Sequence, residues 1–119
     1  MNKTHIEILK EIGEERKKFF LNYKKYSSEI KNKAKQLLGE VRVLVFGSVI
    51  KNSYNIVKSD IDILIISDRV PEKSEERSRI KAEIKSVLPP FNPFQIHLVT
   101  KKEYKNWYKN FIKDDFIEI

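Results

Sequence analysis

The chain contains no cysteine, and no apolar run in it approaches the roughly 18 residues that suggest a membrane span. Without cysteine, disulfide bonds, thiolate chemistry and cysteine zinc sites are excluded. The first residues also lack the apolar segment of a secretion signal, so we expect a cytoplasmic location and no membrane association. What is present, 40% hydrophobic and 11% aromatic residues, indicates a folded globule.

The length of 119 residues leaves room for one domain with a real core and none for a second. We expect a single domain over residues 1–119. It would consist of an N-terminal helical segment (1–38), a catalytic core (41–100) and a C-terminal helix with a tail (101–119). The expected fold class is mixed α/β (α+β), a small mixed β-sheet with helices packed on it.

The net charge is +7, and residues 1–40 contribute +4 of it through ten Lys/Arg and six Glu. The first interpretation is a solvated lysine-rich helix, which is the usual outcome for a charge run. The second is attraction to a polyphosphate or to an acidic partner. No compact basic patch is interleaved with aromatic residues, so nucleic acid is not expected as the main partner.

Apolar residues at three- and four-residue steps predict one long helix over residues 3–38, bent near Gly13. Such a helix would measure roughly 50 Å at 1.5 Å per residue, which exceeds what so small a domain can cover. Either the helix folds back as a hairpin, or its far end packs on another chain. A homo-oligomer or hetero-oligomer is therefore expected.

The remaining elements follow from short apolar runs and their boundaries. Strands are predicted at 41–46, 60–67 and 94–99. Pro71 is expected to open a helix that Pro89-Pro90 ends. Thr100 to Glu103 forms a capping box at the start of the last helix. The tail, residues 116–119, is expected to add a short edge strand.

Two short motifs carry the functional signal. Gly47-Ser48 follows the first apolar strand, and Asp60-Ile61-Asp62 opens the second. Because side chains alternate along a strand, Asp60 and Asp62 project from the same face. Alone, a Gly-Ser is usually a turn and an Asp-x-Asp is usually a strand start or a surface pair. In combination, each at the end of its own apolar strand, they favour a functional site.

The chemistry that fits this pattern is phosphoryl or nucleotidyl transfer. Two carboxylates on one face repel each other, and magnesium, which prefers one or two carboxylates plus substrate oxygens, is the simplest counter-ion. The metal would orient the triphosphate and neutralise charge on the leaving pyrophosphate. Gly47 would let the backbone approach phosphate without a Cβ, and Ser48 with neighbouring N–H groups would donate to phosphate oxygens.

The combined pattern resembles the minimal nucleotidyltransferases of the DNA polymerase β-like superfamily, in their compact archaeal branch. The hallmark is Gly-Ser, a loop of about ten residues, and Ser-Asp-x-Asp before an apolar strand, matched here at 46–52 and 59–66. The resemblance covers residues 41–100 and implies a polymerase β palm-like fold. It implies an enzyme in which Asp60 and Asp62 bind magnesium, while Gly47 and Ser48 hold ATP or another NTP.

Two positions depart from the family pattern. Where the family often has Arg-Gly, this chain has Lys51 and Asn52, which keeps one positive charge for phosphate. Where the superfamily places a third carboxylate as base, strand 94–99 presents Gln95 and His97. A histidine side chain titrates near neutrality, so His97 is a candidate general base. The open alternative is a histidine held by neighbouring backbone or by Asp62.

Members of the family often pair with a helical partner of the HEPN class in toxin–antitoxin modules. The resemblance therefore implies two functions. The first is transfer of NMP, AMP from ATP above all, to a hydroxyl acceptor that includes a protein partner. The second is a catalytically impaired nucleotide-binding protein that acts as antitoxin to a HEPN-type partner. The overlong first helix and the aromatic last helix are candidate docking surfaces, although ordinary core packing on the sheet is the preferred explanation of both.

Overall fold

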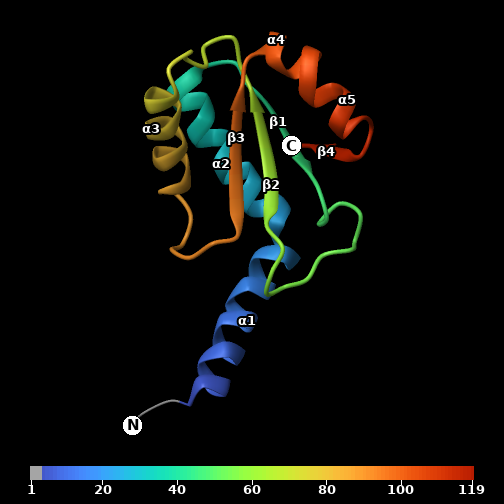
Figure 1. Ribbon diagram of the computed structural model, residues 1–119. Coiled ribbons are helices and arrows are strands. Elements are labelled where there is room, and N and C mark those ends of the chain that lie inside the picture. Colours follow the sequence, from blue (N-terminus) through green and yellow to red (C-terminus); the bar gives the residue numbers. More distant parts are fainter. Residues whose placement is uncertain (1–3) are drawn as a thin grey trace.

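The computed structural model describes residues 4–119. Its centre is a four-stranded sheet in the order β3-β2-β1-β4, with helices on both faces (Figure 1). The four strands are β1 (Arg42–Phe46), β2 (Ile61–Ile66), β3 (Phe94–Val99) and β4 (Phe116–Glu118). Strand β1 runs antiparallel to both β2 and β4, and β2 runs parallel to β3. The mixed α+β class is confirmed, and so is the edge strand at the tail.

The two faces of the sheet are covered by different parts of the chain. Helices α2 (Tyr23–Leu38) and α3 (Ser74–Lys85) pack on the face that carries the odd-numbered residues of β1 and β2. On the other face, the C-terminal helical segment covers Leu44, Leu64 and Ile66 with Ile112, Tyr104 and Tyr108. Asp62 shares this second face but lies at its uncovered end. The alternation of the sequence therefore places a carboxylate beside an apolar layer without burying it.

The predicted single N-terminal helix is wrong in one respect, because it is two helices, α1 (His5–Leu21) and α2. The break is at Asn22 and not at Gly13, which lies inside α1. The side-chain amide of Asn22 and its backbone N–H both donate to the carbonyl of Lys18. Asparagine competes with the backbone in this way and so ends helices. Residue 3, the predicted helix start, lies outside the described residues.

Several other boundaries differ from the sequence prediction. Strand β1 begins at Arg42 and not at residue 41, and β2 ends at Ile66 and not at residue 67. Asp60 lies just before β2 and not within it. Helix α3 begins at Ser74 and not at Pro71, because the Pro71 carbonyl accepts a 2.6 Å hydrogen bond from the Arg77 side chain. The capping box of Thr100 is confirmed, and the last helix follows as α4 (Lys101–Glu103), a π-helical turn η1 (Tyr104–Tyr108) and α5 (Lys109–Ile112). None of the helices in residues 4–119 combines the length and apolarity needed to cross a bilayer.

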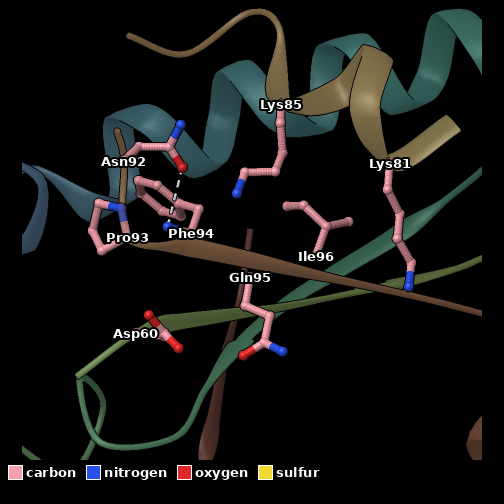
Figure 2. A pocket seen from close by; sticks show the side chains of 8 residues that line it. All are labelled: Asp60, Lys81, Lys85, Asn92, Pro93, Phe94, Gln95 and Ile96. Carbon is pink, nitrogen blue, oxygen red and sulfur yellow. Dashed lines mark hydrogen bonds between the residues drawn. The ribbon is translucent and has the colours of Figure 1, made fainter. Parts of the chain in front are cut away.

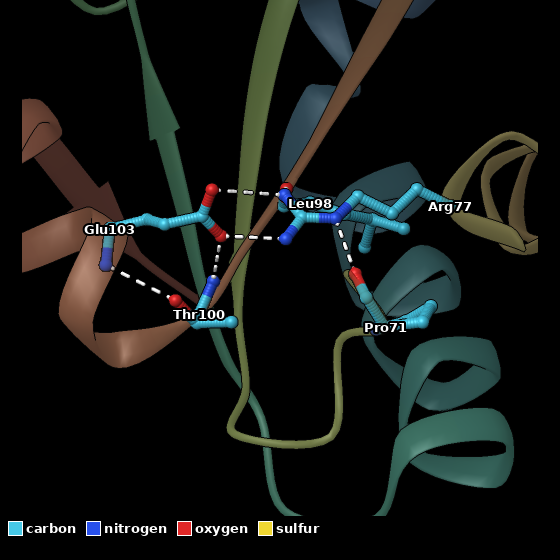
Figure 3. A network of polar contacts seen from close by, with 5 residues as sticks. All are labelled: Pro71, Arg77, Leu98, Thr100 and Glu103. Atoms are coloured by element: carbon cyan, nitrogen blue, oxygen red, sulfur yellow. Dashed lines mark hydrogen bonds and ion pairs between the residues drawn. The ribbon is translucent and has the colours of Figure 1, made fainter. Parts of the chain in front are cut away.

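Arg77 connects three elements at the end of the sheet that lies away from Asp62 (Figure 3). Its guanidinium donates to the carbonyls of Pro71 and Leu98 and forms an ion pair with Glu103 at 2.9 Å. Glu103 also accepts from the Thr100 N–H as part of the capping box. The hydrogen bond from Arg77 lowers the pKa of Glu103 below its ordinary value. This network joins α3, β3 and α4.

The lowered pKa of Glu103 predicts that the folded chain becomes less stable in acid. The pKa of Glu103 is lower in the folded chain than in the unfolded chain, so its contribution is complete above the ordinary glutamate value of about 4.3. It is lost as the pH falls through the folded-state pKa. We expect Glu103→Gln to lower the free energy of unfolding on the order of 1 kcal/mol at neutral pH and to flatten its decline below pH ~4.3. Urea unfolding across pH measures both effects, and an unchanged acid slope would contradict the assignment.

Candidate active site

Gly47 places the Gly-Ser turn next to Asp62 of the Asp-x-Asp motif. It follows β1 with a φ of +88°, in the left-handed region that favours glycine. A Cβ built on Gly47 would lie 2.6 Å from Oδ2 of Asp62, closer than non-bonded atoms approach. The register Phe46 to Asp62 across β1 and β2 produces this proximity. The glycine is thus required twice, by its backbone angle and by the carboxylate next to it.

The turn after Gly47 is closed by its own backbone. The Gly47 carbonyl accepts from the N–H groups of Ile50 and Lys51, and the Ser48 carbonyl accepts from Ser53. Val49 is buried and fixes the turn on the core. Within the described chain, the N–H groups of Ser48 and Val49 have no backbone acceptor. In other proteins, successive backbone N–H groups in a turn make anion-binding concavities. Lys51, three residues after Ser48, is exposed.

Asp62 and His97 lie side by side on the face that Gly47 borders. Leu64 pairs with His97 across the parallel strands, which puts His97 one step along the same face from Asp62. His97 Nε2 lies 3.3 Å from Asp62 Oδ1, and about a quarter of each side chain is exposed. The rings of Phe46 and Tyr108 flank the imidazole with centroid distances of 5.5 and 6.3 Å. His97 is therefore held at the border between the apolar layer and the open end of the sheet.

Asp60 lies at the mouth of β2, beside Gln95. Figure 2 shows both side chains on the side of β3 that faces away from α2 and α3. Gln95 is the register partner of Asp62, so all three residues belong to the same face of the sheet. Asp60 and Gln95 also line a cavity of about 340 Å³ at the free edge of β3. The other residues that line this cavity are Lys81, Lys85, Asn92, Pro93, Phe94 and Ile96.

Sequence patterns do not single out Arg16, yet it connects α1 to the loop in front of Asp60. Its guanidinium donates to the carbonyls of Ile56 at 2.6 Å and Ser59 at 2.5 Å. The only signal in the sequence is an exception to the pattern. Position 16 lies on the same helical stripe as Ile12 and Phe19, where an apolar residue is expected, but it holds a cation. The same loop is closed by Asn55, whose side chain accepts from two N–H groups. Phe20 stacks on Tyr54 at 4.5 Å and fixes the start of the loop.

The two aspartates suit a magnesium ion that is shared with a substrate. Among the described residues, neither forms an ion pair with Lys or Arg, and Asp62 has His97 as its partner. No group of three or more His, Asp or Glu side chains in residues 4–119 could enclose a metal. A two-carboxylate set fits magnesium, which keeps waters and takes substrate phosphate oxygens as its other ligands. It does not fit an all-protein cage.

A glycine turn against Asp62 at the mouth of a mixed sheet fits the nucleotidyltransferase class, and comparison with known proteins shows the family. A family model described as a nucleotidyltransferase domain matches residues 27–119. A crystal structure of a protein assigned as a nucleotidyltransferase is 33% identical, covers 77% of this chain and 95% of its own, and superposes with a TM-score of 0.61. The chain therefore belongs to the nucleotidyltransferase domain family of the polymerase β-like superfamily.

A second solved structure agrees on the fold. It is a protein of Sulfolobus solfataricus assigned as a nucleotidyltransferase, with 19% identity and a TM-score of 0.61 over 87% of this chain and 84% of its own. At that identity the likeness concerns the fold alone. Among curated proteins, none matches this sequence. The family model matches from within α2 onward, so α1 lies outside the region that this model matches.

Proposed function

We propose that the chain is a magnesium-dependent nucleotidyltransferase that moves NMP, AMP from ATP above all, to an acceptor hydroxyl. The observation that carries this proposal is the contact between Gly47 and the Asp62 carboxylate, which joins the phosphate-binding turn to the metal-binding strand. Asp60 and Asp62 would hold magnesium, which when bound would neutralise charge on the leaving pyrophosphate. The Ser48 and Val49 N–H groups, the Ser48 hydroxyl and Lys51 would bind the triphosphate.

The reaction needs two further contributions from the chain, a base and a fixed orientation of the triphosphate. The acceptor oxygen attacks the α-phosphorus, a new P–O bond forms, and the bond to the β-phosphate breaks to release pyrophosphate. The acceptor proton goes to a base, and the candidate is His97, whose Nε2 lies 3.3 Å from Asp62 Oδ1. The turn of Gly47 fixes the triphosphate in one orientation, because its backbone is closed by internal hydrogen bonds.

A second candidate function is supported by an absence: in residues 4–119 no third carboxylate joins Asp60 and Asp62 in a group that could hold a metal. Gln95 and His97 occupy the corresponding face of β3, and neither is an anion at neutral pH. In this case the chain would bind ATP without transferring it, and would mask a HEPN-type protein partner as an antitoxin. Exposed aromatic side chains of the last helix, Trp107 at 63% and Phe111 at 77%, are available to such a partner.

One experiment separates the two functions. The chain is incubated with magnesium and ATP labelled at the α-phosphate, alone and with candidate acceptors, including a helical partner protein. Transfer of label with release of pyrophosphate supports the enzyme. Magnesium-dependent ATP binding without transfer supports the binding protein. Absence of any magnesium-dependent ATP binding would contradict both.

Arg16 gives a prediction about the loop that carries Asp60. We expect Arg16→Gln to weaken magnesium-dependent ATP binding about tenfold, or ~1.4 kcal/mol, because the loop loses both guanidinium hydrogen bonds and Asp60 loses its fixed position. Titration calorimetry measures the change. Lys17→Gln is the matched control, since it removes the same charge from an exposed position of α1. Equal affinities of the two variants would show that Arg16 does not position the loop.

A further inference from the structure

The cavity of about 340 Å³ at the free edge of β3, called the edge cavity below, connects the candidate active site to a pair of cations. Asp60 and Gln95 line it on one side of β3, and Lys81 and Lys85 of α3 line it on the other. Figure 2 shows both lysine side chains extending from α3 toward β3, with Ile96 between them. The edge cavity therefore runs from Asp60 around the edge of the sheet to α3.

Lys81 and Lys85 belong to a row of three cations on one face of α3. Arg77, Lys81 and Lys85 follow one another at steps of four residues. Arg77 is matched within the chain by Glu103 and by two backbone carbonyls. Among residues 4–119, neither lysine takes part in an ion pair with a carboxylate, Asp60 included, although both are half-buried. Two like charges at this spacing repel each other, so a bound anion would stabilise them.

The floor of the edge cavity is part of the core. Phe94 and Ile96 line it and are 2% and 5% exposed. Asn92 holds the turn before β3, since its side chain accepts from the Phe94 N–H and donates to the Pro89 carbonyl. Lysine is a point charge on a flexible stem, so both amines can reach one group above this floor. A fixed apolar floor with two amines beside it suits a compact anion.

The order of the strands places the edge cavity opposite the turn of Gly47. Gly47 follows β1, Asp62 lies on β2, and the cavity lies at β3, so the aspartate strand separates the turn from the cavity. In phosphoryl transfer, the attacking and the leaving oxygens are roughly in line on opposite sides of the phosphorus. A triphosphate held by the turn would release pyrophosphate on the β1 side. The acceptor would then approach from the β3 side, where the cavity and His97 lie.

We propose that the edge cavity is the acceptor subsite, and that the acceptor hydroxyl belongs to a small molecule that also carries a phosphate group. This acceptor is a substrate of the NMP transfer proposed above, so the inference rests on that function. A phosphomonoester carries roughly −1.5 to −2 charges at pH 7 and three acceptor oxygens, and it therefore matches two amines better than a carboxylate does. The cavity volume also lies at the lower end of the range for small-molecule sites, about 300–1,000 Å³.

The transfer step then assigns each group a place. Lys81 and Lys85 bind the phosphate of the acceptor, which stays unchanged. The acceptor hydroxyl oxygen forms the new bond to the α-phosphorus of ATP, and the bond from that phosphorus to the oxygen bridging it to the β-phosphate breaks. Pyrophosphate leaves with the electron pair on the side of Gly47. The acceptor proton goes to the base, for which His97 is the candidate.

A titration followed by nuclear magnetic resonance tests the cavity without nucleotide or magnesium. The probes are glycerol 3-phosphate, glycerate and glycerol, which share hydroxyl groups and differ in charge. Glycerol 3-phosphate is expected to shift the backbone N–H signals of Lys85 and Ile96 and to bind at least about tenfold more tightly than glycerate. Equal binding of glycerate or glycerol, no binding of glycerol 3-phosphate, or shifts confined to Ser48 and Val49 would overturn the proposal.

Two double variants test the lysines. Lys81→Gln with Lys85→Gln is expected to weaken glycerol 3-phosphate binding at least about tenfold, because two charge-assisted contacts are lost. Lys105→Gln with Lys109→Gln is the matched control, since it removes two exposed lysines four residues apart from the C-terminal helical segment. The control should change the affinity by less than about twofold, because exposed charges are screened. An equal loss in both variants would indicate general charge attraction and would overturn the subsite.

Magnesium and a non-hydrolysable ATP analogue separate a failure of the subsite from a failure of the proposed function. Glycerol 3-phosphate is expected to bind while the analogue is bound. If the analogue displaced it, the probe would occupy the triphosphate turn, and the subsite would be wrong while the proposed function stood. If the analogue itself did not bind, the proposed function would fail and the acceptor role with it. The two double variants would still show whether the cavity binds phosphate.

The acceptor role is measured with ATP labelled at the α-phosphate. In the presence of magnesium, label is expected to pass to glycerol 3-phosphate at least about tenfold faster than to glycerol, because only the first is held at the cavity. The double variant at Lys81 and Lys85 should remove this preference while the affinity for the ATP analogue stays unchanged. Equal transfer to both probes, or transfer to neither, would overturn the acceptor role.

Discussion

Asp62→Asn is expected to lower the rate of label transfer from ATP by about a hundredfold to a thousandfold, the range seen when one electrostatic group is removed from an active site. The substitution keeps the size of the side chain and its place beneath Gly47. It removes the negative charge that would hold magnesium, and with it the carboxylate that lies 3.3 Å from His97. Magnesium-dependent ATP binding should weaken in parallel, because metal and triphosphate would bind as a unit.

The control for Asp62→Asn is Asp68→Asn at the opposite end of β2. Asp68 is exposed and forms a surface ion pair with Lys101 at 3.3 Å, so its loss changes charge without touching the candidate site. Surface pairs of this kind contribute roughly 0–1 kcal/mol. Both variants should unfold within a few degrees of the wild type. If Asp62→Asn retained transfer at the rate of Asp68→Asn, the paired carboxylates would have no catalytic role.

The parts of the fold that could be predicted from sequence depend on short-range patterns. Alternation along 61–66 gave the two faces of β2, and the capping box of Thr100 gave the start of the last helix. The predicted bounds of strand β3, residues 94–99, are confirmed. The apposition of Gln95 and His97 with the aspartates also follows from alternation, once the strands are known to be neighbours.

The parts that could not be predicted depend on contacts between distant residues. Arg16 and the carbonyl of Ser59 are 43 positions apart, and no local pattern links a helix cation to a loop carbonyl. The end of α1 at Asn22 depends on a side-chain hydrogen bond that competes with a long helical periodicity. The start of α3 after Pro71 depends on Arg77 binding a carbonyl that would otherwise join the helix. In each case a polar side chain takes a backbone group from regular structure.

Gly47→Ala is expected to have the second largest effect on the candidate active site, because the added Cβ causes both backbone strain and a clash with Asp62. The φ of +88° disfavours any residue with a Cβ, by roughly 1–2 kcal/mol. The added Cβ would also lie 2.6 Å from Oδ2 of Asp62, so either the turn or the carboxylate must move. Movement of either one separates the metal-binding strand from the phosphate-binding turn. We therefore expect ATP binding to weaken by at least about tenfold, more than the loss of stability alone would cause.

Alanine substitutions at two other glycines distinguish the effect of backbone strain from the effect on the candidate active site. Gly39 has a φ of +76° and approaches the flexible side chain of Arg69, so Gly39→Ala should lower the melting temperature and leave ATP affinity unchanged. Gly13 lies within α1 with nothing inside 4 Å, so Gly13→Ala should stabilise the helix by roughly 0.5–1 kcal/mol. Melting curves and ATP titrations of the three variants form one comparison. If Gly47→Ala lost stability but bound ATP like Gly39→Ala, the contact with Asp62 would be a matter of folding and not of function.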